Sequence, residues 1–263
     1  MLILTIRVSN TQRHFFAIAD FCLWIFILQG KIDWVVSIFN LSPAAPKATS
    51  HAAFGGLGRF FNKFCYNIIM IIVDVESSGV DPIKHSVLSI GAIDFLNPKN
   101  QFYGECRIWD GAHIMDEALA VNGFTKEQIT DKKKQTEEAL VKSFLAWVLP
   151  ISEHTIAGQN PSFDRDAIHK AAERYHLNWP MAYRTIDLHT ACWFHMIKRE
   201  VKPPIANKRS DLNSDKIMKY VGIPTEPRPH NALNGAKVAA EALSRLLYNK
   251  SLIEEFKGYP IPW

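Results

Sequence analysis

The stretch Ile71–Gly79, with the sequence IIVDVESSG, decides how the rest of this 263-residue chain is interpreted. It is an apolar run that ends in two acids, Asp74 and Glu76. Side chains alternate between the two faces of a strand, so both acids project from the same face. Adjacent carboxylates on a largely apolar strand repel each other and lose hydration, which is costly unless a cation lies between them. Oxygen ligands of this kind suit Mg²⁺ or Mn²⁺. The alternative is a strand end that simply faces water.

Charge and cysteine content limit the classes of partner and compartment. The chain has 30 Lys and Arg against 26 Asp and Glu, and removing the six basic and two acidic residues of positions 1–69 leaves 24 of each. Residues 70–263 are therefore formally neutral. This balance does not indicate strong electrostatic binding of long nucleic acid, and it favours short or single-stranded substrates held at one site. The four cysteines show no paired spacing and no Cys-x-x-Cys, which favours a reduced, cytoplasmic setting.

Residues 1–69 differ from the rest of the chain. They contain no Glu, are rich in Phe and show no clean helical or strand period. The apolar run from Phe15 to Leu28 is interrupted by Asp20 and is shorter than the roughly 20 residues that a transmembrane helix needs. Met70 comes directly before the apolar residues of a predicted strand, as the first residue of a translated protein would. We expect residues 1–69 to be an N-terminal extension that results from a mis-assigned gene start, and we expect no stable membrane association. The alternative interpretation of these residues is a membrane-associating segment.

From position 70 onward the pattern predicts an α/β domain over residues 70–249, followed by a C-terminal tail, 250–263. Strands are expected at 69–75, 86–95, 101–109, 155–158 and 184–186, and helices at 136–149, 163–176, 189–198, 213–220 and 231–248. A capping box is expected at 125–128, and 201–209 is expected to be a loop. One antiparallel hairpin beside a parallel portion gives a five-stranded mixed sheet flanked by helices.

A third acid, Asp164, lies on the apolar stripe of the helix predicted at 163–176, four positions before Ile168, whereas Asp166 lies on the solvated face. An inward acid in a first helical turn needs a partner, or else acts as a favourable charge at the helix N-terminus. Both interpretations stay open. Asp187, which follows the fifth strand, is interpreted as the N-cap of the next helix.

Three segments together resemble the motifs of the DEDD 3′–5′ exonucleases, namely Asp74–Gly79, Ala157–Asp164 and Pro229–Leu233. Their order and spacing are similar over roughly residues 70–249. The His form of that family includes ribonuclease T, oligoribonuclease and polymerase proofreading subunits. The resemblance implies a ribonuclease H-like fold, two divalent ions, Mg²⁺ or Mn²⁺, and hydrolysis of phosphodiester bonds. The substrate would be the 3′ end of single-stranded DNA or RNA, and the products nucleoside monophosphates.

By the same resemblance, Asp74 bridges both ions, Glu76 binds one of them and Asp164 holds the other. In such sites one ion activates water and the other stabilises the departing oxygen. His230 would accept the proton of the attacking water, a task suited to a pKa near neutrality. These four residues are the candidate catalytic residues, and the three acids are the candidate metal ligands.

Ser77 and Ser78 stand where the family commonly has two threonines, and their hydroxyls could contact the terminal nucleotide. Together with Asn160 they are the candidate substrate-binding residues. The sequence leaves open DNA against RNA, the substrate length and the oligomeric state, a homodimer included.

The chain departs from the family at Gly235, where the fourth metal-binding Asp would lie, five positions after His230. Glu241 is expected on the outer face of the last helix with Arg245, so that it cannot substitute. One metal site therefore loses a charged ligand. We expect the fold to tolerate Gly235→Asp, and this substitution to strengthen metal binding.

The missing acid defines the alternative function, a catalytically weakened or inactive nucleic-acid-binding module of the same fold. A further alternative is a proofreading subunit whose tail docks a polymerase, but residues 250–263 leave little room for a docking module. Retention of three acids and a histidine favours the enzyme, because a binding module needs no proton acceptor beside them.

Overall fold

The computed structural model of the chain describes residues 70–263. The predicted extension, residues 1–69, lies outside the described residues. Five strands form one sheet in the order β3-β2-β1-β4-β5. Their bounds are Ile71–Ser77 (β1), Val87–Asp94 (β2), Gln101–Glu105 (β3), Ile156–Gly158 (β4) and Ile186–Asp187 (β5). β1 pairs antiparallel with β2 and parallel with β4. The predicted five-stranded mixed sheet is confirmed.

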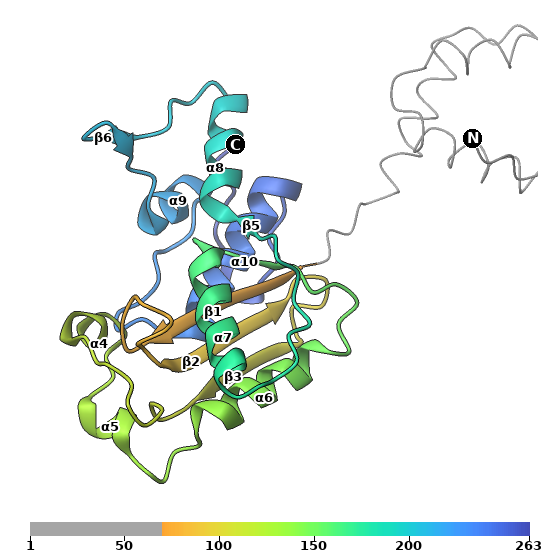
Figure 1. Cartoon of the computed structure of the whole chain (residues 1–263). Coiled ribbons are helices and arrows are strands. Elements are labelled where there is room, and N and C mark those ends of the chain that lie inside the picture. Colours follow the sequence, from red (N-terminus) through yellow and green to blue (C-terminus); the bar gives the residue numbers. More distant parts are fainter. Residues whose placement is uncertain (1–69) are drawn as a thin grey trace, which may run out of the picture. The chain divides into compact units, whose positions relative to one another are not determined.

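Helices cover both faces of this sheet (Figure 1). One face is covered by α6 (Glu137–Val148) and α7 (Pro161–Arg174). The other is covered by α8 (Leu188–Lys198), α9 (Ser214–Val221) and α10 (Ala232–Tyr248). Two short helices, α4 (Asp116–Asn122) and α5 (Lys126–Thr130), lie beyond the end of β1. A single 3₁₀ turn, Glu254–Phe256, follows α10.

Strand alternation in β1 separates the apolar core from the acids. Ile71, Val73 and Val75 pack against α6 and α7, whereas Ile72 packs against α10. Asp74 and Glu76 share the face of Ile72, because residues two apart on a strand point the same way. The two acids therefore lie on the α10 side of the sheet.

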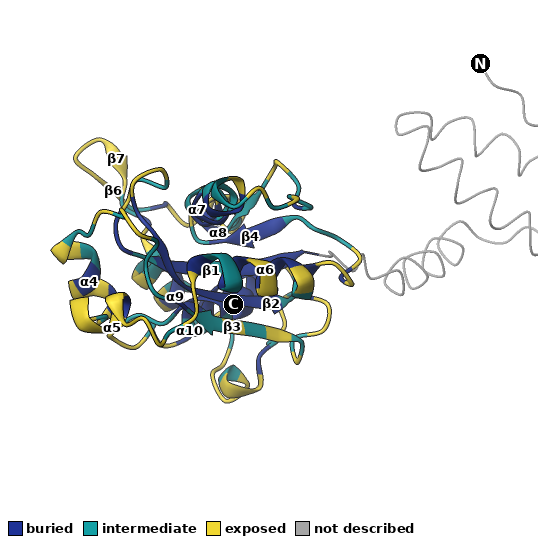
Figure 2. Ribbon diagram, turned by 60° about the horizontal axis from the view of Figure 1, so that its bottom comes forward, coloured by how far each residue is buried: buried dark blue, intermediate teal, exposed yellow. Residues whose placement is uncertain are grey.

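Helix ends follow the predicted capping chemistry. Thr125 and Gln128 form a capping box at the start of α5. Asp187 caps α8 by accepting the backbone N–H groups of His189 and Thr190, as expected. The sequence pattern missed α4, and it placed a loop where β6 (Ile205–Ala206) and β7 (Arg209–Ser210) form an exposed hairpin, seen in Figure 2.

The C-terminal tail packs onto α10 and corrects one expectation. Glu241 and Arg245 are both fully buried and form an ion pair of 2.6 Å between Oε1 and Nε. The guanidinium also donates to the carbonyls of Val221, Phe256, Tyr259 and Pro260. The carboxylate accepts the N–H groups of Leu252 and Ile253. The predicted outward position of Glu241 is wrong, because the tail covers that face of the helix.

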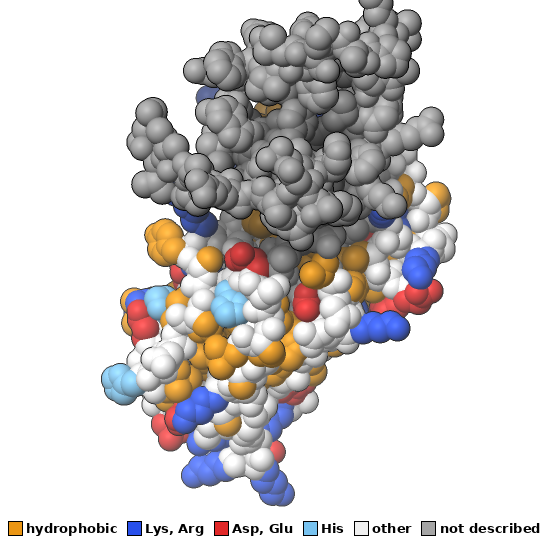
Figure 3. All heavy atoms as spheres, turned by 90° about the vertical axis from the view of Figure 1, so that its right-hand side faces the viewer, with side chains coloured by type: hydrophobic (Ala, Val, Ile, Leu, Met, Phe, Trp, Pro, Cys, Tyr) orange, Lys and Arg blue, Asp and Glu red, His pale blue; other side chains and the backbone are white. Residues whose placement is uncertain are grey.

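On the face seen in Figure 3, basic and acidic side chains are interspersed with apolar ones. This distribution agrees with the balance of 24 basic and 24 acidic residues in this part of the chain. Within residues 70–263, none of the helices has both the length and the apolar character that a membrane span requires.

Candidate active site

The two acids of β1 carry no charge partner among residues 70–263. Asp74 lies opposite Gly91 of β2, and Glu76 lies opposite Ser89. Glu76 is only 8% exposed. Neither carboxylate accepts a hydrogen bond or forms an ion pair with any residue between 70 and 263. The hydroxyl of Ser89 is also buried without a partner among these residues. An uncompensated buried carboxylate is costly, so this strand end fits a bound cation.

Asp164 reaches the same place from α7. It is 3% exposed, whereas the side chain of Asp166 is 47% exposed and pairs with Arg165. The predicted inward and outward positions of these two aspartates are confirmed. The backbone N–H groups of Asp164 itself and of Val75 in β1 counteract the effect of burial on the pKa of Asp164.

Burial and mutual repulsion shift the pKa values of these acids upward. Burial, and then the charges of Asp164, Glu76 and Glu226, hold the pKa of Asp74 well above its ordinary value. Burial and the charge of Glu226 raise the pKa of Glu76 to about 7. Burial also raises the pKa of Asp164, with a smaller contribution from Glu76. Each negative charge makes the next one harder to form, and a cation removes that penalty.

His230 and Glu226 come from the loop between α9 and α10. The Nδ1 atom of His230 lies 3.7 Å from Oε2 of Glu226, and the side chains are 35% and 13% exposed. Oε1 of Glu226 accepts the backbone N–H of Asn231 at 3.0 Å. Glu76, Glu226 and His230 each offer a ligand atom within 4.8 Å of the others. Sequence reasoning missed Glu226. The signal was an acid four positions before the motif histidine, in a proline-rich loop.

Contacts with α4 fix the position of this loop. The backbone N–H of His230 donates to the carbonyl of Val121 at 3.2 Å. The side-chain amide of Asn122 donates to the carbonyl of Ser77 at 3.1 Å. Gly123 has a φ of 72°, and a Cβ there would lie 2.5 Å from Cβ of Pro229. The short helix that the sequence pattern missed therefore holds His230 beside the end of β1.

Two glycines allow α10 to approach the acids. A Cβ at Gly91 would lie 2.1 Å from the carbonyl carbon of Ala232 and 2.3 Å from the backbone nitrogen of Leu233. A Cβ at Gly235 would lie 2.3 Å from Oδ2 of Asp74. Asp74 occupies the space beside position 235, so Gly235→Asp would require the Asp74 carboxylate to shift. The expectation that the fold tolerates this substitution and that metal binding strengthens stays a prediction.

The three predicted substrate-binding residues lie around the acids. The Ser77 hydroxyl donates to the carbonyl of Gly79. Ser78 is fully buried, and its hydroxyl donates to the carbonyl of His113 and accepts the N–H of Ser86. These bonds indicate that Ser78 holds the loop after β1. Asn160 is exposed, with a φ of 52°, at the start of α7. Their contact with substrate stays a prediction.

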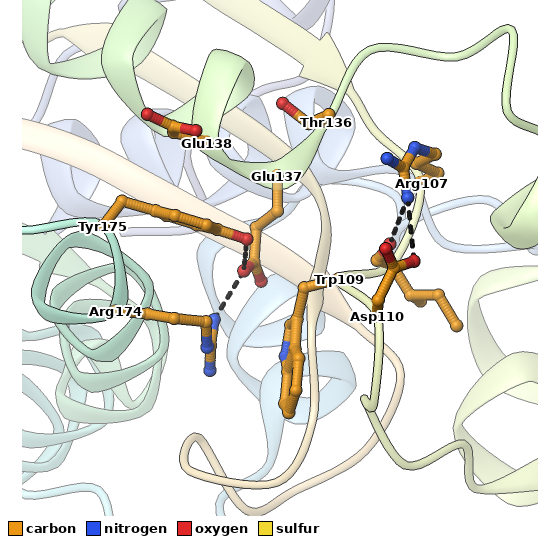
Figure 4. A pocket seen from close by; sticks show the side chains of 9 residues that line it. Arg107, Trp109, Asp110, Thr136, Glu137, Glu138, Arg174 and Tyr175 are labelled. Atoms are coloured by element: carbon orange, nitrogen blue, oxygen red, sulfur yellow. Dashed lines mark hydrogen bonds and ion pairs between the residues drawn. The ribbon is translucent and has the colours of Figure 1, made fainter.

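A separate pocket of about 250 Å³ lies between the start of α6 and the end of α7 (Figure 4). None of the predicted site residues lines it. Its buried Glu137 accepts hydrogen bonds from Arg174 and Tyr175 and from Ser86 and Val87 at the start of β2. The guanidinium of Arg174 also stacks over Trp109 at 4.6 Å. These bonds tie α6 and α7 to the sheet, which is a structural role.

The sequence model of the family RNase_T, described as Exonuclease, matches residues 71–243, which is more than half of the chain. The chain belongs to this exonuclease family. The match spans β1, the start of α7 and the His230 loop, so the resemblance to DEDD exonucleases is confirmed at the level of the family. A search of curated proteins finds no match.

Solved exonuclease structures share the fold. E. coli Exonuclease I in complex with a dA16 oligonucleotide has a TM-score of 0.56 at 16% identity, over 69% of this chain and 41% of that chain. The nuclease domain of 3′hExo, a DEDDh family member bound to rAMP, has a TM-score of 0.54 at 16% identity, over 72% of this chain and 96% of that chain. Cell-death related nuclease 4 has a TM-score of 0.54 at 16% identity, over 73% of this chain and 66% of that chain. This chain thus spans about two fifths of Exonuclease I. The ribonuclease H-like fold is confirmed.

Proposed function

We propose that this protein is a metal-dependent 3′–5′ exonuclease that hydrolyses single-stranded or short nucleic acid to nucleoside monophosphates. The observation that carries the proposal is the gathering of Asp74, which is half-buried, with the buried Glu76 and Asp164, beside an accessible histidine and with no cationic side chain of residues 70–263 paired to Asp74 or Glu76. The exonuclease family supports the reaction class. The relatives solved with an oligonucleotide or a nucleotide support nucleic acid as the substrate.

The three acids would hold two divalent ions, Mg²⁺ or Mn²⁺, because hard cations prefer carboxylate oxygens. Such a pair supplies a nucleophilic water and stabilises the leaving 3′ oxygen. His230 is accessible enough to accept the proton of the attacking water. The fixed position of its loop against α4 keeps the imidazole beside the acids. Ser77 and Asn160 would contact the terminal nucleotide.

The test is digestion of 5′-labelled single-stranded DNA and RNA of the same sequence, with Mn²⁺, with Mg²⁺ and with EDTA. The expected product is a ladder that shortens from the 3′ end, absent in EDTA. A closed circular single strand, which has no end, should resist. Cleavage of the circle would show an endonuclease instead.

A matched pair of variants assigns the chemistry to the site. Asp164→Asn should abolish release of nucleotides, whereas Asp166→Asn, two positions away on the exposed side of the same helix, should leave the rate within about twofold. If the native protein binds oligonucleotides but releases no nucleotide under any metal condition, the inactive binding module is the correct function.

A further inference from the structure

We propose that Glu226 is the fourth acidic metal ligand of this site and takes the place of the carboxylate that position 235 lacks. The inference rests on the proposed function in one respect, that the site binds divalent cations. The residue belongs to the loop before α10 rather than to the helix itself. The helix keeps Gly235, and the loop supplies the charge.

The geometry of the carboxylates carries this assignment. Glu76 is more than nine-tenths buried, and its carboxylate has no hydrogen-bond or ion-pair partner among residues 70–263. An oxygen of Glu226 and a nitrogen of His230 both lie within 4.8 Å of it. Two carboxylates that converge on one another in a largely buried place, with no Lys or Arg of the described residues paired to either, are the arrangement that a divalent cation stabilises.

The Glu226 side chain is oriented for this role. Its Oε1 is held by the backbone N–H of Asn231. Asn231 is itself fixed as the N-cap of α10, where its side chain accepts the N–H groups of Leu233 and Asn234. Because one oxygen is anchored to the backbone, the other has a defined direction, and it lies 3.7 Å from Nδ1 of His230.

The space beside α10 explains why the acid lies on the loop. Asp74 already fills the volume that any side chain at position 235 would need, since a Cβ there would meet its carboxylate at 2.3 Å. A ligand from the helix and Asp74 in its present position exclude one another. Glu226 comes from the loop before α10, and one of its oxygens lies within 4.8 Å of a carboxylate oxygen of Glu76.

The alternative role for Glu226 is to orient the imidazole of His230, and the experiment separates the two. Binding of Mn²⁺ to the full chain, without nucleic acid, is measured by titration calorimetry and by the electron paramagnetic resonance signal of free Mn²⁺. The variants are Glu226→Gln, His230→Ala and their combination, with Glu254→Gln on the exposed 3₁₀ turn as the matched control. Gln keeps the acceptor for Asn231 and removes only the charge.

The expected result is that Glu226→Gln weakens Mn²⁺ binding threefold or more, in the native and in the His230→Ala background alike, while Glu254→Gln has no effect. Glu226→Asp, which keeps the charge on a shorter side chain, should bind Mn²⁺ better than Glu226→Gln. The proposal is overturned if Glu226→Gln weakens Mn²⁺ binding less than threefold, or if its effect on Mn²⁺ binding disappears in the His230→Ala background. Circular dichroism confirms that each variant is folded.

The failure of this inference is distinguishable from failure of the proposed function. If Glu226→Gln weakens Mn²⁺ binding but the native protein digests no nucleic acid, the ligand assignment stands and the exonuclease does not. If the native protein is an active exonuclease and Glu226→Gln binds Mn²⁺ as well as it does, the ligand assignment fails alone.

Discussion

The carboxylate of Asp74 lies against the backbone of Gly235, so that a Cβ at position 235 would be 2.3 Å from Oδ2 and 2.7 Å from Cγ. Position 235 is in the first turn of α10, and Asp74 is on the central strand of the sheet. The contact sets the direction of the acid that the family resemblance assigns to both metal ions. Adding one carbon to the helix would therefore force the carboxylate of Asp74, a candidate metal ligand, to rotate.

Gly235→Ala should separate stability from activity. Alanine is the better helix former by about 1 kcal/mol, so the melting temperature should stay the same or rise. Asp74 must turn away from the new methyl group, so Mn²⁺-dependent nucleotide release should fall at least about tenfold. Asn234→Ala, one position earlier, is the control and should keep its activity. Full activity in Gly235→Ala would show that Asp74 has room to move.

The metal-free protein should lose stability as the pH rises. The pKa of Glu76 is raised from 4.5 to about 7, so between these values the folded protein binds more protons than the unfolded chain. Glu76 in this way contributes on the order of 3 kcal/mol to the free energy of unfolding. This contribution is fully present below about pH 4.5 and is lost as the pH rises through about 7. Asp74 and Asp164 act in the same direction.

This effect is measured by urea unfolding in EDTA. Glu76→Gln should be more stable than the native protein at pH 8 and should differ little from it at pH 5. With saturating Mn²⁺ the order at pH 8 should reverse, because the ion binds the native acids. A variant that is less stable than the native protein at pH 8 in EDTA would contradict the prediction.

Removal of the buried arginine should destabilise the whole domain. Arg245→Met leaves Glu241 buried without its cation. It also leaves four carbonyls without their donor, one at the end of α9 and three in the tail after α10. The expected loss in the free energy of unfolding is about 3–5 kcal/mol. Lys257→Met removes only an exposed ion pair with Glu254 and should cost less than about 1 kcal/mol. Equal effects would show that the buried pair contributes little.

Residues 70–263 should fold without the first 69. The sheet and the helices on both of its faces lie within this range, as do the described core clusters. The shorter protein should melt in one cooperative transition and release nucleotides at the rate of the full chain. If it aggregates or melts without a transition, part of the extension belongs to the fold.

The sequence allowed much of the fold to be predicted, because most elements carry local signals. β1 opens with the apolar run Ile71–Val73, and Asn213 and Gly222 mark the ends of α9 by their capping chemistry. The short helix α4 has no side-chain cap and few buried residues, so its pattern was too weak to find. Glu241 was placed on the outside because helical periodicity does not reveal that a later segment will cover a face.

The site was predictable only where its residues lie in the family motifs. Asp74, Glu76, Asp164 and His230 were found because each lies in a motif whose order is specific. Glu226 was not found, since it lies outside the motifs and its approach to Glu76 depends on the path of a loop. The conflict at Gly235 was also hidden, because it depends on the separation between a strand and a helix.

Gly91 and Gly235 place an unusual demand on the evolution of this chain. Neither offers a functional group, yet any side chain at Gly91 would meet the backbone of α10 within 2.1–2.3 Å, and any at Gly235 would meet Asp74. At these two positions selection would act on empty volume rather than on chemistry. A scan of all substitutions for nuclease activity should therefore mark both as intolerant, as if they were catalytic.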